Sequence, residues 1–227
     1  MVINMDFSQR VVIDTETLDW VDSPAKGVQR RMLDREAAES GRATSLVRYA
    51  PNSYFPPHTH TGGEEFLVLD GIFSDEHGDY GPGMYVRNPV GSSHQPFTRG
   101  GCQILVKLWQ MVPDDQDFVR IDTTREGAWR PGAADGLAAC DLHVIGEERI
   151  RLSRWQPGTS YVAHDHPGGE EVLVLDGGLS DEDGHYGKGT WLRLPHGSRH
   201  TPFSEMGCML YVKTGHLAAT SSRLRTH

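Results

Sequence analysis

Apolar and polar positions alternate in several short stretches of the chain, which is the pattern of strands that bury one face. The alternation is clearest in residues 45–49 and 150–155. Three further runs are rich in apolar residues, and they cover residues 64–70, 103–109 and 209–213. Because every run is short, the pattern predicts many brief strands and few long elements.

The segments between these runs have the composition of turns. Residues 75–79 and 181–185 contain glycine and acidic residues, which is typical of hairpin connections. Helical periodicity is weak throughout, and residues 30–40 are its best segment. We therefore predict an all-β protein built as a sandwich or small barrel.

One long motif occurs twice in the chain, at an offset of 106 residues. Residues 58–71 read HTHTGGEEFLVLDG, and residues 164–177 read HDHPGGEEVLVLDG. Without any gap, the same offset relates the later segments Tyr80-Gly81, Pro96-Phe97 and Val106-Lys107 to Tyr186-Gly187, Pro202-Phe203 and Val212-Lys213. A repeat of this length predicts a duplicated structural unit.

Each copy occupies nearly half of the chain, so we expect two barrels in tandem. The junction is placed near Arg120, after the polar stretch 113–117, which gives one barrel in residues 1–120 and another in residues 121–227. The polar residues 220–227 are expected to be frayed.

Charge and composition exclude several classes of protein. The 227 residues include 31 acidic and 22 basic side chains, for a formal charge of −9, so nucleic-acid binding is not expected. Apolar runs are too short to span a membrane and the first ten residues lack an apolar signal region, so we expect no membrane association and a cytoplasmic protein. The three cysteines form no CxxC pair, which excludes a cysteine zinc ribbon.

Histidine and glutamate supply the candidate chemistry. Residues i and i+2 of a strand face the same side, so His58 and His60 can converge. The glycines at 62–63 provide a bend before Glu64, and the return segment brings back His94. The second copy repeats this set as His164, His166, Glu170 and His200.

Three imidazoles and one carboxylate suit a divalent metal ion. A single HxH pair is more often an ordinary surface or core feature than a ligand pair. Eight residues kept in frame across two copies are hard to explain by coincidence, so we predict one divalent metal per barrel. Zinc is the first expectation, and iron, manganese and nickel are also compatible with these ligands.

These motifs resemble those of the cupin superfamily, which read G-x5-HxH-x3/4-E-x6-G and G-x5-P-x-G-x2-H-x3-N. The first copy has Asn52 where the leading glycine is usual, and asparagine also tolerates left-handed backbone geometry. The closing asparagine, which is not a ligand, is replaced by Thr98 and Ser204. The resemblance implies an all-β bicupin, with two double-stranded β-helix (jelly-roll) barrels in tandem.

The longer pattern, HxHxGGEExLVLDG followed by GxxxxxPxGSxHxPF, is similar to the ChrR-type cupin family over roughly residues 10–217. That family includes the C-terminal cupin of ChrR anti-sigma factors, where such a site holds zinc. The pattern is also similar to cupin dioxygenases that cleave acetylacetone-like or hydroxyacetophenone-like compounds with ferrous iron. Residues 1–57 contain no cysteine, whereas the sigma-binding module of ChrR carries an HxxxCxxC motif.

Two functions follow from this resemblance. The first is a regulatory zinc protein that senses a small molecule and lacks a sigma-binding N-terminal domain. The alternative is a ferrous dioxygenase acting on a β-diketone-like or hydroxyketone-like carbonyl compound. Either function implies a small-molecule ligand or substrate in a barrel cavity. The sequence indicates no catalytic residue beyond the metal ligands. A homo-oligomer is compatible with both functions.

Two kinds of charged residue recur in frame outside the candidate ligands. Glu65 and Glu171 alternate with the ligands along their strands, so we expect them on the opposite face, solvated or paired. Lys107 and Lys213 lie in predicted strands, and we expect them at the surface.

Overall fold

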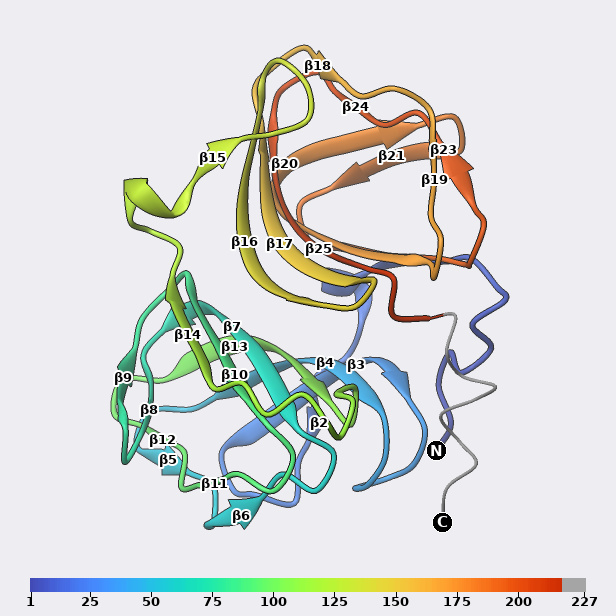
Figure 1. Ribbon diagram of the computed structural model, residues 1–227. Coiled ribbons are helices and arrows are strands. Elements are labelled where there is room, and N and C mark those ends of the chain that lie inside the picture. Colours follow the sequence, from blue (N-terminus) through green and yellow to red (C-terminus); the bar gives the residue numbers. More distant parts are fainter. Residues whose placement is uncertain (218–227) are drawn as a thin grey trace. The chain divides into compact units, whose positions relative to one another are not determined.

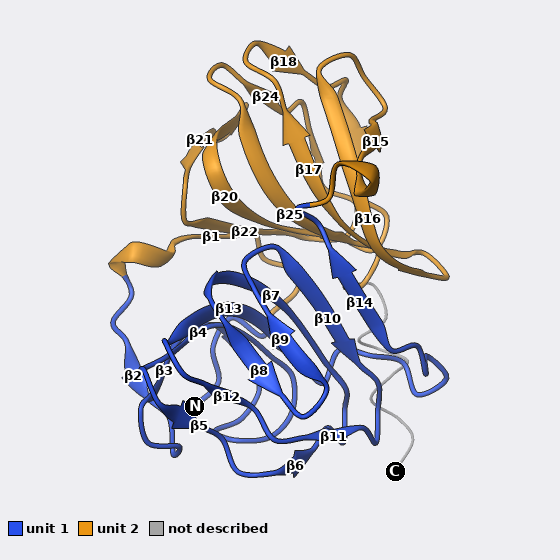
Figure 2. Cartoon of the chain, turned by 90° about the vertical axis from the view of Figure 1, so that its left-hand side faces the viewer, with its two compact units in different colours: residues 1–5, 18–124 blue, residues 6–17, 125–227 orange. Residues whose placement is uncertain are grey.

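A computed structural model describes residues 1–217 of the chain, and the polar tail 220–227 therefore lies outside the described residues. The chain forms two compact units (Figure 2). The N-terminal unit comprises residues 1–5 and 18–124, and the C-terminal unit comprises residues 6–17 together with the described residues from 125 onward. Each unit is built almost entirely of antiparallel strands (Figure 1), which confirms the all-β prediction.

The N-terminal unit contains a main sheet of seven strands in the order β14-β10-β7-β13-β4-β3-β2, a second sheet in the order β5-β12-β8-β9, and the pair β6-β11. Its strands are β2 (Val21–Asp22), β3 (Val28–Arg35), β4 (Ala43–Tyr49), β5 (Ser53–Tyr54), β6 (His58–Thr59), β7 (Glu64–Gly71), β8 (Phe73–Asp75), β9 (Gly78–Tyr80), β10 (Met84–Asn88), β11 (Ser93–His94), β12 (Phe97–Thr98), β13 (Cys102–Leu108) and β14 (Val119–Asp122).

The C-terminal unit repeats this plan. Its main path runs β1-β22-β20-β25-β17-β16-β15, with β18, β21 and β24 continuing the sheet and β19-β23 forming a separate pair. Its elements are β1 (Val11–Asp14), the 3-10 turns η1 (Thr15–Thr17) and η2 (Glu126–Ala128), β15 (Arg130–Pro131), β16 (Leu137–Ile145), β17 (Glu148–Trp155), β18 (Thr159–Ser160), β19 (His164–Asp165), β20 (Glu170–Asp181), β21 (Gly184–Gly187), β22 (Thr190–Leu194), β23 (Arg199–His200), β24 (Phe203–Ser204) and β25 (Cys208–Thr214).

Each main sheet has an edge strand that comes from the other copy of the repeat. This strand lies at the start of that other copy in the sequence. β1 belongs to the C-terminal unit, where it pairs with β22, and β14 holds the equivalent place beside β10 in the N-terminal unit. The two strands read VVID and VRID, so they are themselves a repeated element. The units therefore exchange their first strands along the chain.

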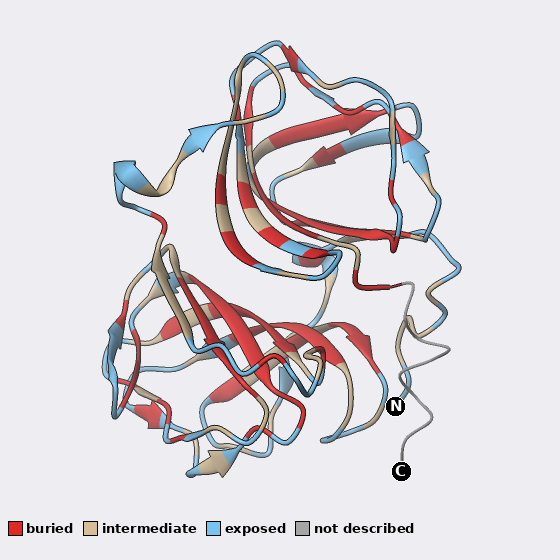
Figure 3. Cartoon of the chain, in the orientation of Figure 1, coloured by how far each residue is buried: buried red, intermediate tan, exposed pale blue. Residues whose placement is uncertain are grey.

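Alternating apolar side chains fill the interior of each unit. In Figure 3 the strands of both units carry many of the buried residues, which are coloured red. Each of the equivalent residues named below is at most 6% exposed, and burial of such a side chain contributes about 1.5–3 kcal/mol. Equivalent positions fill both interiors: Phe66, Val68, Val86, Ile104 and Val106 in the N-terminal unit, and Val172, Val174, Leu192, Leu210 and Val212 in the C-terminal unit.

Residues 30–40, the best helical segment by pattern, are not helical. β3 pairs with β4 from Val28 opposite Tyr49 to Arg35 opposite Ala43, and the chain then bends through residues 36–42. The weak helical periodicity is overridden because pairing with β4 satisfies the backbone hydrogen bonds of the segment and buries its apolar side chains.

The prediction of surface lysines is wrong in both copies. Lys107 is 2% exposed and donates to the hydroxyl of Thr44 over 3.0 Å. Lys213 is fully buried, with its Nζ 3.0 Å from a carboxylate oxygen of Glu148. Both partners lie on the neighbouring strand, and they compensate the cost of removing an ammonium group from water.

The paired alternative for the glutamates is confirmed. Glu65 is 1% exposed, forms an ion pair with the guanidinium of Arg87 and accepts a hydrogen bond from Tyr85. Glu171 is fully buried, with a carboxylate oxygen 3.3 Å from Nε2 of His216.

Neither short helical turn of the described residues has the length and hydropathy that crossing a membrane requires.

Candidate metal centre

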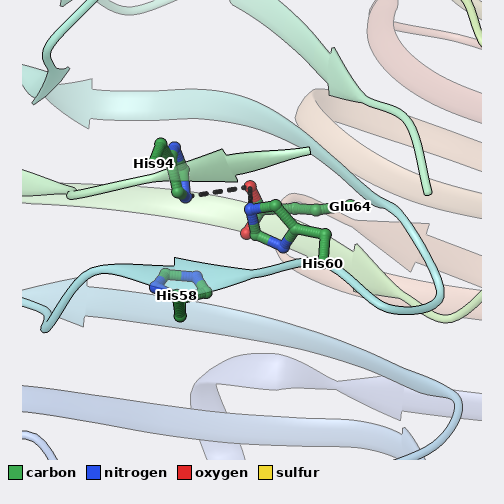
Figure 4. Close-up of side chains that lie close together, drawn as sticks. All are labelled: His58, His60, Glu64 and His94. Carbon is green, nitrogen blue, oxygen red and sulfur yellow. Dashed lines mark ion pairs between the residues drawn. The ribbon is translucent and has the colours of Figure 1, made fainter. Parts of the chain in front are cut away.

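Short paired strands bring the four candidate residues of the N-terminal unit together. His58 on β6 lies directly opposite His94 on β11. After His60 the chain turns through Gly63, whose φ of +75° lies in the left-handed region that favours glycine, and Glu64 then begins β7. Figure 4 shows the side chains of all four residues pointing toward one another.

The four side chains are close enough to share one ion. Each offers one nitrogen or oxygen atom, and these atoms lie within 4.8 Å of one another. The carboxylate of Glu64 is 3.4 Å from Nε2 of His60 and 3.5 Å from Nε2 of His94. His60, Glu64 and His94 are buried, whereas His58 is partly exposed.

Hydrogen bonds on the outer side of the ring fix how two imidazoles face this centre. Nδ1 of His58 is 2.9 Å from the carbonyl oxygen of Pro56, and Nδ1 of His94 is 3.1 Å from a carboxylate oxygen of Asp75. A carbonyl or carboxylate oxygen only accepts, so both Nδ1 atoms carry the proton. Each Nε2 therefore presents a lone pair, as in metal sites where an outer carboxylate or carbonyl orients the histidine.

Two nitrogens at the centre fit a metal ion. Nε2 of His60 and Nε2 of His94 are buried and have no hydrogen-bond partner within the protein. Buried polar atoms without a partner are costly, and a cation bound between these nitrogens and Glu64 would satisfy both. The donor set and the orphaned atoms therefore fit a divalent ion, although the ligand role of each residue stays a prediction.

Burial and charge act on these histidines in opposite directions. Burial lowers the pKa of His60, which favours the neutral form that a metal requires. For His94 burial also acts to lower the pKa, but the hydrogen bond with Asp75 and the charge of Glu64 raise it overall. A divalent ion would compete with that proton, since only a lone pair on Nε2 can bind metal.

The C-terminal unit repeats the arrangement with one difference. His164 on β19 lies opposite His200 on β23, and nitrogens of His164, His166 and His200 lie within 4.8 Å of one another. Glu170 is 3.6 Å from Nε2 of His166 and 3.7 Å from Nε2 of His200, but it is outside this tight set. Three imidazoles therefore converge closely here, with the carboxylate at the edge.

The environment of the glutamate explains this difference. In the N-terminal unit the amide of Asn88 donates to Glu64 over 3.0 Å, and its oxygen accepts from Arg120 over 2.7 Å. Because arginine can only donate, this contact fixes which end of the amide faces Glu64. At the offset of 106 the counterpart of Asn88 is Leu194, and burial raises the pKa of Glu170 to about 8.

The in-frame repeat contained signals for these supporting residues that the sequence analysis did not use. Asp75 and Asp181 recur within the repeated Ser-Asp-Glu segments, and Asp181 lies 3.2 Å from Nδ1 of His200. The exchange of Asn88 for Leu194 is visible at the same offset. Comparison of the copies position by position identifies both the shared support and the difference between the sites.

Replacing Asn88 by leucine is expected to weaken metal binding in the N-terminal unit by about 10–100-fold, because an outer hydrogen bond to a ligand carboxylate is lost. Competition with a chromogenic chelator measures the affinity. The site of the C-terminal unit, which already has leucine at this position, serves as the internal control and keeps its affinity. An unchanged affinity at the first site would show that Asn88 does not support Glu64.

The two candidate centres open onto cavities of different size. The cavity of the N-terminal unit measures about 520 Å³ and is lined by His58, His60 and Glu64 together with residues of β3, β4 and β13. The cavity of the C-terminal unit measures about 100 Å³ and is lined by His164, Glu170 and His200. The larger one has room for a small organic molecule, and the smaller one has room for a few water molecules.

Larger side chains on equivalent wall positions account for part of this contrast. At the offset of 106, Ser45 and Tyr49 of β4 correspond to Arg151 and Trp155 of β17, and all four line their cavities. Trp109 also lines the larger cavity, with a left-handed φ of +57° and 47% exposure. Its ring packs on the bend before Glu64, where a Cβ on Gly62 would approach it to 2.3 Å.

Several solved structures share the fold of this chain. A "putative dioxygenase" from Nostoc punctiforme aligns over 93% of this chain and 84% of its own, at 19% identity and a TM-score of 0.78. The Ylba protein of Escherichia coli aligns over 92% of both chains, at 14% identity and a TM-score of 0.72. A point mutant of salicylate 1,2-dioxygenase from Pseudoaminobacter salicylatoxidans aligns over 80% of this chain and 73% of its own, at 12% identity and a TM-score of 0.63.

No curated protein matches the sequence. At these identities the structural likeness concerns the fold alone. The expected tandem of two cupin units is confirmed by a family model. The model of the ChrR Cupin-like domain matches residues 8–112 and again residues 117–218, which together are most of the chain. The chain therefore belongs to the ChrR cupin-like family, and it carries that domain twice.

Proposed function

We propose that the chain is a divalent-metal protein whose N-terminal unit binds a small organic molecule at its metal centre. The observation that carries this proposal is the cavity of about 520 Å³ that reaches His58, His60 and Glu64. A ligand in this cavity lies beside the metal, which would polarise a carbonyl or carboxylate oxygen as a Lewis acid. The smaller cavity of the C-terminal unit supports a structural role for a second ion.

The described lining of the cavity favours binding over acid–base catalysis. Its carboxylates are Glu64, a proposed ligand, and Glu39, which is paired with Arg30. Tyr49 is partly buried, and this burial raises the pKa of its hydroxyl well above its usual range. With no separate group poised to exchange a proton near neutral pH, we propose zinc-dependent sensing of a small molecule as the function.

A ferrous dioxygenase is the second candidate, and the size of the larger cavity favours it. Histidine and carboxylate ligands are compatible with ferrous iron, which would supply the chemistry for activating dioxygen. The cavity has room for a carbonyl substrate beside the centre, and its apolar walls from Val47, Ile104 and Val106 would exclude water from the reacting atoms.

Metal analysis, a binding experiment and an oxygen-uptake measurement on the full chain test the proposal. We expect protein purified without added metal to contain zinc and to bind acetylacetone or a hydroxyketone, with the signal lost in His94→Ala. Oxygen uptake by the ferrous-loaded chain with the same compounds would assign the dioxygenase function instead. A chain that holds metal but neither binds these compounds nor consumes oxygen with them would overturn the proposal.

A further inference from the structure

The wall of the larger cavity carries an ion pair that the candidate metal centre does not use. Arg30 on β3 faces Glu39, with Nη1 and Nη2 at 3.2 and 2.9 Å from the two carboxylate oxygens. This two-point contact between guanidinium and carboxylate is the strong geometry for that pair of groups. Both residues line the same cavity as His58 and Glu64.

The two partners are unequally exposed. The side chain of Arg30 is 16% exposed and that of Glu39 is 55% exposed. The guanidinium is thus part of the wall, while the carboxylate approaches from the solvent side. Because solvent screens the charge of the half-exposed Glu39, the carboxylate group of a ligand can compete with it for the guanidinium.

The guanidinium of Arg35 is a second positive charge near Glu39, so the cations at this wall outnumber the carboxylate of Glu39. Arg35 donates through Nε to the carbonyl of Ala38 at 2.9 Å, and its guanidinium lies 4.0 Å from Glu39. Burial, followed by the nearby charge of Arg30, lowers the pKa of Arg35. Two cations therefore face one carboxylate, in a chain whose net charge is −9.

Neither member of the Arg30–Glu39 pair is part of the repeated scaffold. Arg30 pairs with Val47. In the equivalent pairing of the C-terminal unit, Ala139 takes the place of Arg30. The connection from β3 to β4 covers residues 36–42, whereas that from β16 to β17 covers only residues 146–147. The longer connection carries Glu39 to the guanidinium, so both partners are specific to the unit with the large cavity.

We propose that this cavity binds a small organic carboxylate, whose carboxylate group takes the place of Glu39 on Arg30. The inference rests on the proposed ligand binding in the N-terminal unit and adds the chemical class of the ligand. Apolar side chains of Val28, Val47 and Ile104 also line this cavity. An aromatic or aliphatic body would pack there, with its anionic end on Arg30 and its other end toward His58.

Titration calorimetry of the full chain with benzoate and its neutral isostere benzamide tests the inference. We expect benzoate to bind more tightly than benzamide, and Arg30→Gln to weaken benzoate binding about 10-fold or more while leaving benzamide unchanged. Glu39→Gln removes the competing carboxylate and is expected to tighten benzoate binding about threefold. Arg48→Gln is the matched control, since Arg48 lies on β4 with its guanidinium over the ring of Trp20.

The outcomes separate this inference from the proposed function. Benzoate binding that is equal in the Arg30→Gln variant and the unchanged chain, or no tighter than benzamide binding, would overturn the carboxylate site. Failure of Glu39→Gln to tighten binding would overturn the replacement of Glu39. If acetylacetone still binds in a metal-dependent way while benzoate does not, only this inference fails. If neither compound binds, the proposed function fails with it.

Discussion

Replacing His94 by alanine is expected to remove the metal ion from the N-terminal unit and to leave the ion of the C-terminal unit in place. His94 supplies a buried Nε2 without another partner, and its Nδ1 is held by Asp75. Loss of the outer support of a ligand costs 10–100-fold in affinity, so loss of the ligand itself is expected to cost more than about 100-fold. Elemental analysis after dialysis against a chelator should show the metal content fall by half.

Three companion variants make this result specific. His200→Ala is expected to remove the other ion, and the double variant His94→Ala/His200→Ala both. His77→Ala is the control, because His77 is an exposed histidine of the same unit outside the candidate centre. Metal content that is unchanged in the double variant would contradict the assignment of both centres.

The convergence of the candidate ligands was predictable because it depends on local geometry that is repeated. The HxH spacing places two imidazoles on one side of a strand, and the glycines that follow allow the turn to Glu64. Asn52 adopts the left-handed φ of +59° that its place in the motif required, where Gly158 has +77°. Duplication strengthened these local rules, since the three histidines meet in both units.

The exchange of β1 and β14 was not predictable from the same pattern. The segments VVID and VRID show that the two strands are equivalent, but equivalence does not tell which sheet each strand completes. Both choices satisfy the same backbone hydrogen bonds, so the pattern of the strands does not decide between them. A boundary drawn from sequence alone therefore misses residues 6–17 of the C-terminal unit.

The charged residues on the opposite face of the main sheet show a further limit of the alternation. The alternation of side chains along a strand assigns Glu65 and Lys107 to one face of the sheet. It does not tell whether other parts of the protein bury that face. Both are cross-strand neighbours at the pairing of β7 with β13 and both are buried. Their recurrence in frame as Glu171 and Lys213 was the available signal, because a solvated surface imposes less on residue type than a buried network does.

Replacing Arg87 by methionine is expected to destabilise the N-terminal unit by about 3–5 kcal/mol, because it removes the cation from a buried network of charges. The side chain of Arg87 is fully buried and forms ion pairs with both Glu65 and Asp115, each 1% exposed. Methionine keeps much of the volume of the side chain, so the loss comes mainly from two carboxylates left without this cation in a dry environment. Calorimetry of the full chain should show an unfolding transition shifted down by on the order of 10 °C.

Arg48→Met separates the loss of a buried cation from the loss of any arginine. Arg48 lies on β4, donates to the side chain of Gln29 and is exposed, so its replacement is expected to change the free energy of unfolding by about 0.5 kcal/mol or less. A second test keeps Arg87 and changes Glu65 to glutamine, which leaves Asp115 as a partner for the guanidinium and should cost less than Arg87→Met. If Arg87→Met unfolds at the same temperature as the unchanged chain, the buried network contributes nothing net, as is known for ion pairs whose desolvation cancels their attraction.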